Sequence, residues 1–274
     1  MSAFACPVCG ERLERREKAY ACPNGHSYDI ASEGYVYLLP PNKKHSKTPG
    51  DDKQMVASRR RFLEAGYYRI FSDALNELAL RCLPQGKSAV LDAGCGEGYY
   101  TGRLAEFLSS HGADAGLCGF DISKAAVRAA AKKYRSIPFA VGSMFGIPVP
   151  DASADLLTDV FAPIVPEEFA RVVKPGGAMI LAVPGERHLY GLKQILYDKP
   201  YENERRDTEY PGFRFLKRVP VRGEIRTDDP QVMRDLFAMT PYFWKTPREG
   251  SERLNAAELL KTEIGFDFLL YRKE

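Results

Sequence analysis

Four residues near the start of the chain have the types and the spacing of a metal site. Cys6 and Cys9 form a C-x2-C pair, and Cys22 and His26 form a C-x3-H pair. Zn²⁺ binds three thiolates and one imidazole as a tetrahedron, and such a closed set is typical of a structural metal. A disulfide between the first two cysteines is the alternative. We interpret residues 1–38 as a zinc ribbon that holds one structural Zn²⁺ and whose folding depends on it.

A second group of residues forms a glycine-rich turn that follows an acid. Asp92 ends a predicted strand, and Gly94, Gly96 and Gly98 come directly after it. Small residues in such a turn let a ligand approach the backbone at the carboxyl edge of a sheet. A dinucleotide fingerprint would need glycine at position 99, where the chain has Tyr99, so the spacing disfavours a pyrophosphate ligand. A glycine turn without any ligand is the alternative.

An acid also ends the next predicted strand. Asp121 stands in the run Gly-Phe-Asp-Ile-Ser, and a carboxylate at this point can accept hydrogen bonds from both hydroxyls of a ribose. The alternative is that Asp121 only caps the helix that follows. Ser123 can fill that position, which leaves the carboxylate for a ligand. The glycine turn and Asp121 together predict a site for an adenosine group.

The elements that would position these residues alternate between strand and helix from residue 87 onward. Repeats of this length predict a parallel sheet that is covered by helices on both faces. The strand candidates are residues 88–92, 115–121, 137–141, 155–161 and 177–183, and the helix candidates are residues 99–110, 123–134 and 165–173. Later strands are expected at 213–226 and 264–272, whereas the segment 184–212 is charged and irregular.

Composition shifts divide the chain into segments. A polar linker rich in Pro, Lys and Ser, residues 39–50, separates the ribbon from one large domain, residues 51–274. Asp51 or Asp52 can cap the first helix of that domain. The expected parts of the domain are a helical cap (51–86), a cofactor-binding half (87–183) and a half with the late strands and a variable, substrate-side segment (184–274).

Overall composition restricts the class of protein. Of the 274 residues, 45% are apolar and 27% are charged, as in ordinary globular domains. No stretch approaches 18 consecutive apolar residues, and no apolar leader precedes Cys6. We therefore expect a cytoplasmic protein without membrane contact, in which Cys82, Cys95 and Cys118 stay reduced.

Positive charge gathers near the start of the chain. Residues 1–70 hold 12 Lys and Arg against 8 Asp and Glu, whereas the remainder holds 27 against 28. The candidate RNA-binding residues of the two basic runs are Lys43, Lys44, Lys47, Arg59, Arg60 and Arg61. This asymmetry fits a polyanionic partner such as RNA, and an ordinary solvated surface is the alternative.

The glycine turn, Asp121 and a late Lys-Pro-Gly-Gly turn at 174–177 resemble motifs of the class I S-adenosylmethionine-dependent methyltransferases. The resemblance implies an α/β, Rossmann-like fold. It also implies that the acceptor lies at the end of the fourth strand, residues 159–163. Asp159 is our candidate for the base that takes a proton from the acceptor, unless it caps a turn or pairs with an arginine. Phe161 is a candidate for stacking on a base, unless it belongs to the core.

Further motifs resemble the bacterial 23S rRNA guanine-N1 methyltransferases. They are the ribbon ligands and the runs at 33–40, 49–51, 65–68, 94–101 and 239–241. The resemblance implies S-adenosylmethionine-dependent methylation of guanine N1, at nucleotide 745 or 748, in the helix 35 loop of 23S rRNA. The glycine loop looks like the Gram-negative subgroup and residues 159–163 like the Gram-positive one. A homodimer is expected from family likeness alone.

The family likeness also implies roles for single residues. It makes Cys6, Cys9, Cys22 and His26 the zinc ligands. With the residues of the two turns added, the expected cofactor-binding residues are Tyr68, Asp92, Gly94, Gly96, Glu97, Gly98, Tyr99, Asp121, Ile122 and His188. Tyr68 could instead be a core aromatic and His188 a surface residue. A small-molecule methyltransferase, for example one acting on a quinone precursor, and a zinc-ribbon binding module without activity are the rival functions.

Overall fold

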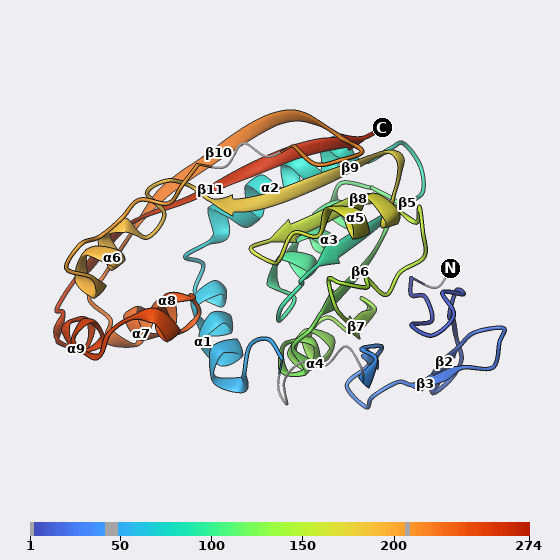
Figure 1. The fold of residues 1–274 in the computed structure, drawn as a ribbon, viewed down its shortest axis with the longest axis horizontal. Helices are drawn as coiled ribbons and strands as arrows, with labels where there is room; N and C mark the ends of the chain where they lie inside the picture. Colours follow the sequence, from blue (N-terminus) through green and yellow to red (C-terminus); the bar gives the residue numbers. More distant parts are fainter. Residues whose placement is uncertain (1–2, 42–48, 206–208) are drawn as a thin grey trace.

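An eight-stranded sheet in the order β10-β11-β9-β8-β5-β6-β7-β4 is the centre of the computed structural model, which describes residues 3–41, 49–205 and 209–274 (Figure 1). Its strands are β4 (Val36–Tyr37), β5 (Ser88–Ala93), β6 (Ala115–Asp121), β7 (Phe139–Val141), β8 (Ala154–Val160), β9 (Val173–Pro184), β10 (Phe213–Thr227) and β11 (Leu260–Lys273). The strands from β4 to β9 pair in parallel, and β11 and β10 add antiparallel. All seven strands expected from residue 87 onward are confirmed.

Helices cover both faces of this sheet, as predicted. The helices of the first two thirds of the chain are α1 (Lys53–Glu64), α2 (Arg69–Cys82), α3 (Tyr99–Ser110), α4 (Lys124–Lys133) and α5 (Pro166–Val172). Alternate residues of β11 point to opposite faces because a strand has a period of two. Phe266 and Phe268 belong to the core under α2 and α3, and Leu269 and Tyr271 belong to the core under α5.

The ribbon is docked on the main sheet. Its own strands, β1 (Glu14–Arg15), β2 (Ala19–Ala21) and β3 (Ser27–Asp29), form a small antiparallel sheet. The following strand, β4, pairs with β7 and so becomes an edge of the main sheet. In addition, the Ala5 N–H donates to the Pro148 carbonyl at 2.9 Å, and Phe4 is fully buried in the core that α5 shares. The segment predicted as the ribbon therefore contributes one strand to the large domain.

In the last third of the chain, the described residues form four short helices that the sequence pattern did not predict. They are α6 (Tyr190–Leu196), α7 (Pro230–Ala238), α8 (Tyr242–Lys245) and α9 (Arg248–Ala256). The expectation that residues 184–212 are irregular is wrong for α6. Its first turn is held by β11, because Glu263 accepts from the Gly191 N–H and Thr262 accepts from the Leu192 N–H. Tertiary contacts stabilise helices this short. Only α7 has a clear local start signal, with Asp229 as N-cap and Pro230 at its first position.

Candidate active site and zinc centre

The four ribbon residues come together as one cluster, with all ligand atoms within 4.8 Å of one another. The Sγ atoms of Cys9 and Cys22 are 3.7 Å apart, and Cys22 Sγ is 3.3 Å from Nδ1 of His26. Tetrahedral zinc with Zn–S bonds of about 2.3 Å needs thiolates about 3.8 Å apart, so the set fits Zn²⁺. Cys6 and Cys9 are free thiols, which removes the disulfide alternative. The Tyr28 hydroxyl lies 3.1 Å from Cys6 Sγ, where it orients that ligand from outside the cluster.

The glycine turn between β5 and α3 lies at the carboxyl edge of the sheet. Gly94 has φ +73°, and a Cβ at this position would clash with Ala162 on the turn that follows β8. Gly98 has φ +85° and precedes the first residue of α3 as its N-cap. The left-handed backbone and the close approach both require glycine. The turn after β5 and the turn after β8 are therefore in contact at the carboxyl edge of the sheet.

Two residues predicted to bind the cofactor support this turn from below. The Asp92 carboxylate accepts from Oγ1 of Thr101 at 2.5 Å and from Oγ1 of Thr158 at 3.0 Å, which joins β5 to α3 and β8. Burial raises the pKa of Asp92 to about 6, against the lowering effect of the two hydroxyls. The ring of Tyr99 is largely buried beside Arg103, whose guanidinium lies 5.6 Å from the ring centroid. Asp92 therefore ties β5 to α3 and β8 beneath the turn, and Tyr99 packs beside it at the start of α3.

Asp121 lies at the end of β6 and faces the glycine turn. Its Oδ2 accepts from the Gly96 N–H at 3.0 Å and its Oδ1 from the Ser123 N–H at 2.7 Å. Ser123 caps α4 as expected, because its Oγ accepts from the Ala126 N–H. Each Asp121 oxygen keeps a lone pair, so the carboxylate is held in place and can still accept from two ribose hydroxyls. Burial raises the pKa of Asp121.

A small cavity of about 90 Å³ adjoins Asp121. It is lined by Gly94, Phe120, Asp121, Ile122, Ser143, Met144, Phe145, Ala162 and Pro163. The lining is mostly apolar, with the Asp121 carboxylate at one side. This is the chemistry that an adenine next to a ribose requires. The loop at 143–145 lines this cavity, and no motif in the sequence indicates it.

Tyr68 and His188 meet in the core at the other side of the glycine turn. His188 Nδ1 accepts from the Gly265 N–H at 3.1 Å, which leaves the ring proton on Nε2, 3.5 Å from the Tyr68 hydroxyl. Burial lowers the pKa of His188 to about 3, so the imidazole stays neutral. His188 is only 7% exposed and is not a surface residue. Glu97 is also buried, and its pKa is raised by burial to about 7.

Asp159 and Phe161 lie where β8 ends. Asp159 Oδ1 accepts from the Ala162 N–H at 2.9 Å, whereas the buried Oδ2 accepts no hydrogen bond from the part of the chain that the structure describes. Burial raises the pKa of Asp159 well above its usual range. Phe161 adopts φ +61°, a strained conformation for this residue, and its side chain is 44% exposed. Its ring centroid is 4.4 Å from that of Phe266 and 5.7 Å from that of His188.

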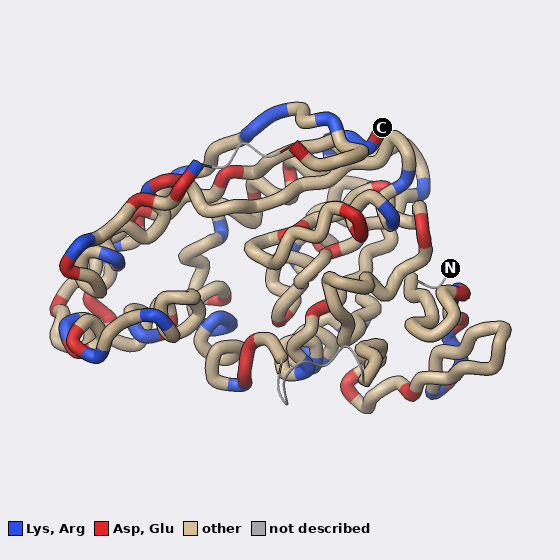
Figure 2. Tube along the Cα trace, in the orientation of Figure 1, with Lys and Arg blue, Asp and Glu red and all other residues tan. Residues whose placement is uncertain are grey.

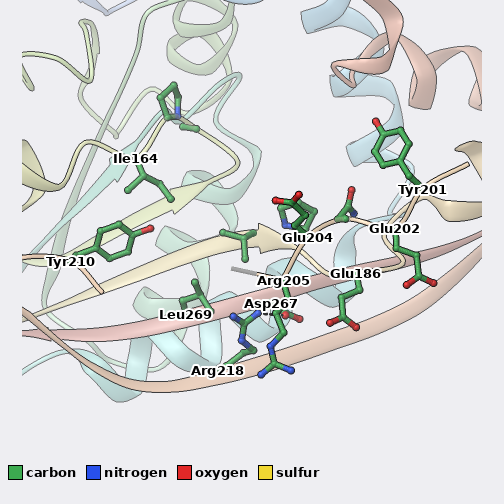
Figure 3. A pocket seen from close by; sticks show the side chains of 15 residues that line it. Ile164, Glu186, Tyr201, Glu202, Glu204, Arg205, Tyr210, Arg218, Asp267 and Leu269 are labelled. Carbon is green, nitrogen blue, oxygen red and sulfur yellow. Dashed lines mark hydrogen bonds and ion pairs between the residues drawn. The ribbon is translucent and has the colours of Figure 1, made fainter. Parts of the chain in front are cut away.

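A larger cavity of about 970 Å³ opens beside the turn that follows β8 (Figure 3). Ile164 and Tyr210 line one end and Tyr201 and Glu202 the other. At its floor Asp267 is ion-paired to Arg218, at 2.5 Å, and to Arg222. The cavity gives the acceptor side a polar recess that no motif in the sequence indicates.

The basic residues expected to bind RNA divide into two groups. Lys43, Lys44 and Lys47 lie outside the described residues. The three arginines of α1 all have partners within the protein: Arg59 pairs with Asp51, Arg60 with Glu64 at 2.8 Å, and Arg61 with Asp235 at 2.5 Å. Figure 2 shows acidic and basic residues mixed along α1 and the segments near it. The arginine run is therefore not the free basic strip that the sequence indicates.

Comparison with known proteins defines the class. Residues 4–47 match the family described as "RlmA, N-terminal", a zinc ribbon, and residues 85–219 match a methyltransferase domain. The fold is similar to that of a candidate methyltransferase from Bacillus halodurans C-125, at 16% identity and a TM-score of 0.50, over 73% of this chain and 99% of the other. The protein is a class I, S-adenosylmethionine-dependent methyltransferase with an N-terminal zinc ribbon.

Relatives define the family. A 23S rRNA (guanine(748)-N(1))-methyltransferase from Streptomyces fradiae is 31% identical over 91% of this chain and 89% of its own length. A protein from Micromonospora griseorubida, named a candidate 23S rRNA (guanine-N(1)-)-methyltransferase, is 38% identical over 68% of this chain and 67% of its own length. The chain belongs to the 23S rRNA (guanine-N1-)-methyltransferase family.

The residues present fit both groups that this family uses. The Cys3His cluster has the donor set and spacing of structural Zn²⁺. S-adenosylmethionine combines an adenosine with a sulfonium and an ammonium group. The cavity beside Asp121 suits the adenosine, and the buried carboxyl of Glu97 suits positive charge. The cofactor-binding roles of Tyr68 and His188 stay predictions.

Proposed function

We propose that this enzyme methylates N1 of a guanine in the helix 35 loop of 23S rRNA, at nucleotide 748 or 745. The observation that carries the proposal is the pairing, at the end of β8, of an exposed aromatic ring with a buried carboxyl oxygen that lacks a hydrogen-bond donor. A purine that is unstacked from an RNA loop needs a surface to stack on and an acceptor for its N1 proton. The name of the Streptomyces fradiae relative favours nucleotide 748.

The geometry supports a direct displacement. The guanine stacks on Phe161, and its N1 faces Asp159. Oδ2 of Asp159 would take the N1 proton, and the N1 electron pair would attack the methyl group that bound S-adenosylmethionine would supply, with its sulfur leaving as a neutral thioether. The cofactor supplies the methyl group and a positive sulfonium. Burial disfavours the carboxylate form of Asp159 in the free protein, so the rate of transfer should rise with pH as this group ionises.

Other parts of the chain would bind the RNA. The ribbon and the linker lysines 43, 44 and 47 would contact the RNA backbone, together with Arg60 and Arg61 of α1. Among the described residues, no helix is long and apolar enough to cross a membrane. A 23S rRNA substrate supports a cytoplasmic location, and family likeness supports a homodimer.

The test is mass mapping of 23S rRNA from a strain that lacks the gene, with and without the gene restored. We expect one monomethyl guanine in the helix 35 loop to disappear and return. In vitro, a helix 35 hairpin should accept a radiolabelled methyl group, and a hairpin with guanine replaced by adenine at both 745 and 748 should not; the two single replacements then identify the nucleotide. Methylation elsewhere in rRNA, or of a quinone precursor only, would overturn the proposal.

A further inference from the structure

One arginine of α1 reaches the cofactor turn instead of the solvent. A Cβ placed on Gly96 would lie 3.8 Å from Nη1 of Arg59, so the guanidinium lies directly over the turn. Its Nη2 donates to the Met239 carbonyl at 3.1 Å, and Nη1 is ion-paired to Asp51. The side chain is only 29% exposed. Arg59 is thus held on two sides above the loop that binds S-adenosylmethionine.

Acidic side chains also lie close to the glycine turn, near Arg59. Glu97 is buried and Asp121 is partly buried; burial raises the pKa values of both, and the positive charge of Arg59 opposes that rise. These acids suit the sulfonium and the ammonium group of the cofactor. They repel its third charge, the α-carboxylate, which needs a cation of its own.

We propose that Arg59 binds the α-carboxylate of S-adenosylmethionine and so belongs to the cofactor site and not to the RNA surface. Asp51 shows that a carboxylate can pair with this guanidinium where it lies. The backbone carbonyl of Asp51 also accepts from Ser123 Oγ at 2.5 Å, next to the turn of Asp121. The carboxylate site over Gly96 therefore adjoins the ribose site, as one bound molecule requires. A planar guanidinium is the side chain best suited to a carboxylate.

Decarboxylated S-adenosylmethionine provides the decisive probe, because it keeps the adenosine, the sulfonium and the ammonium and lacks only the carboxylate. Calorimetry of the full-length, zinc-loaded protein without RNA would measure both ligands. We expect Arg59→Gln to weaken S-adenosylmethionine binding about 10- to 100-fold, as for loss of a charged hydrogen bond. Binding of the decarboxylated compound should change less than about threefold, because Arg59 has no partner on it.

A matched control is Arg81→Gln on α2, where an exposed arginine pairs with Glu77 far from the turn. It should leave both affinities unchanged. Arg59→Lys keeps the charge and loses the planar fork, so we expect an intermediate loss for S-adenosylmethionine only. This variant also serves if thermal melting shows that Arg59→Gln does not fold.

Three results would overturn the proposal. Equal weakening of both ligands would mean that Arg59 only holds the turn in shape. Unchanged binding of both would remove Arg59 from the site. Loss of affinity for a helix 35 hairpin, with S-adenosylmethionine binding intact, would return Arg59 to the RNA surface. Because the experiment measures cofactor binding alone, an error in the proposed RNA substrate would not affect it.

Discussion

The cofactor side and the acceptor side of this active site hold their carboxylates in opposite ways. At the ends of β5 and β6, both oxygens of Asp92 and both oxygens of Asp121 accept hydrogen bonds from the protein. At the end of β8, one oxygen of Asp159 accepts a hydrogen bond and the other accepts none from the described residues. A buried polar atom without a partner is costly, so it persists where a ligand supplies the partner.

The backbone shows the same contrast. The left-handed positions of the cofactor turn are glycines, which adopt that conformation without strain. The left-handed position of the acceptor turn is Phe161, which does not. The cofactor side is therefore complete in the free protein, whereas the acceptor side stores strain and an unmet hydrogen bond. We infer that RNA binding completes the second side.

The largest effect that tests this contrast is expected at Asp159. Asp159→Asn keeps an oxygen that accepts the hydrogen bond from the Ala162 N–H, but it removes the carboxylate that takes the proton from guanine. We therefore expect the rate of methyl transfer at saturating ligands to fall about 10²- to 10⁴-fold. Binding of S-adenosylmethionine should stay within about twofold, since that side keeps its contacts. Single-turnover transfer to a hairpin measures the first quantity and calorimetry the second.

Asp155→Asn is the matched control, because Asp155 lies at the opposite end of β8 from Asp159 and pairs with Lys174. It should leave the transfer rate unchanged. If Asp159→Asn transfers methyl groups at the normal rate, Asp159 only caps the turn after β8. A second readout is the pH dependence of the rate, which should flatten when the titrating group is removed.

A smaller effect is expected on the cofactor side. Asp121→Ala removes the acceptor for two ribose hydroxyls, so S-adenosylmethionine and 5′-methylthioadenosine should both bind about 10- to 100-fold more weakly. The transfer rate at saturating cofactor should change much less. Equal affinity of the variant and the natural protein would exclude Asp121 from the ribose site. The Arg59 variants should separate these two ligands, and the Asp121 variant should not.

The cofactor side could be predicted from the sequence because local rules determine it. A buried strand, a glycine turn and an acid at the next strand end appear within 34 residues, from 88 to 121, and β6 and α3 have the predicted bounds. The zinc cluster was equally predictable, since its spacing is fixed by the metal.

The acceptor side depends on contacts between distant segments, which no local pattern contains. Phe266 lies under Phe161, and the Gly265 N–H fixes the tautomer of His188, although 77 residues separate the last two. The late helices also depend on contacts with distant segments, such as those of Glu263 and Thr262 with the first turn of α6. In the sequence Arg59 belongs to a basic run, and nothing local indicates its partner Met239, which is 180 positions away.

Stacking on Phe161 should give the next effect in size. Phe161→Ala removes the exposed ring, so we expect the KM for a helix 35 hairpin to rise about tenfold, in line with stacking of one base on an aromatic ring. S-adenosylmethionine affinity should not change. Phe161→Leu is the control for volume, and it should show nearly the same loss, since a leucine fills space without offering a flat ring. A normal KM in both variants would assign Phe161 to the core.

The smallest effect concerns pH and the cofactor side alone. Burial raises the pKa of Glu97 to about 7 in the free protein, so much of this group is neutral below that pH. A cationic ligand binds the ionised form better, and its affinity should therefore rise with pH, by about three- to tenfold between pH 6 and 8. Asp92, with a pKa of about 6, contributes only at the lower end, and His188, with a pKa of about 3, contributes nothing there.

Calorimetry in two buffers of different ionisation enthalpy should show proton release when S-adenosylmethionine binds near pH 7. Glu97→Gln should remove most of the slope, whereas Asp159→Asn should retain it, provided that Glu97 is the group next to the cofactor's positive charges. A slope that follows Asp159 in place of Glu97 would mean that the acceptor carboxyl senses the bound cofactor directly. The contrast between a completed cofactor side and an open acceptor side would then fail, because one carboxyl would belong to both.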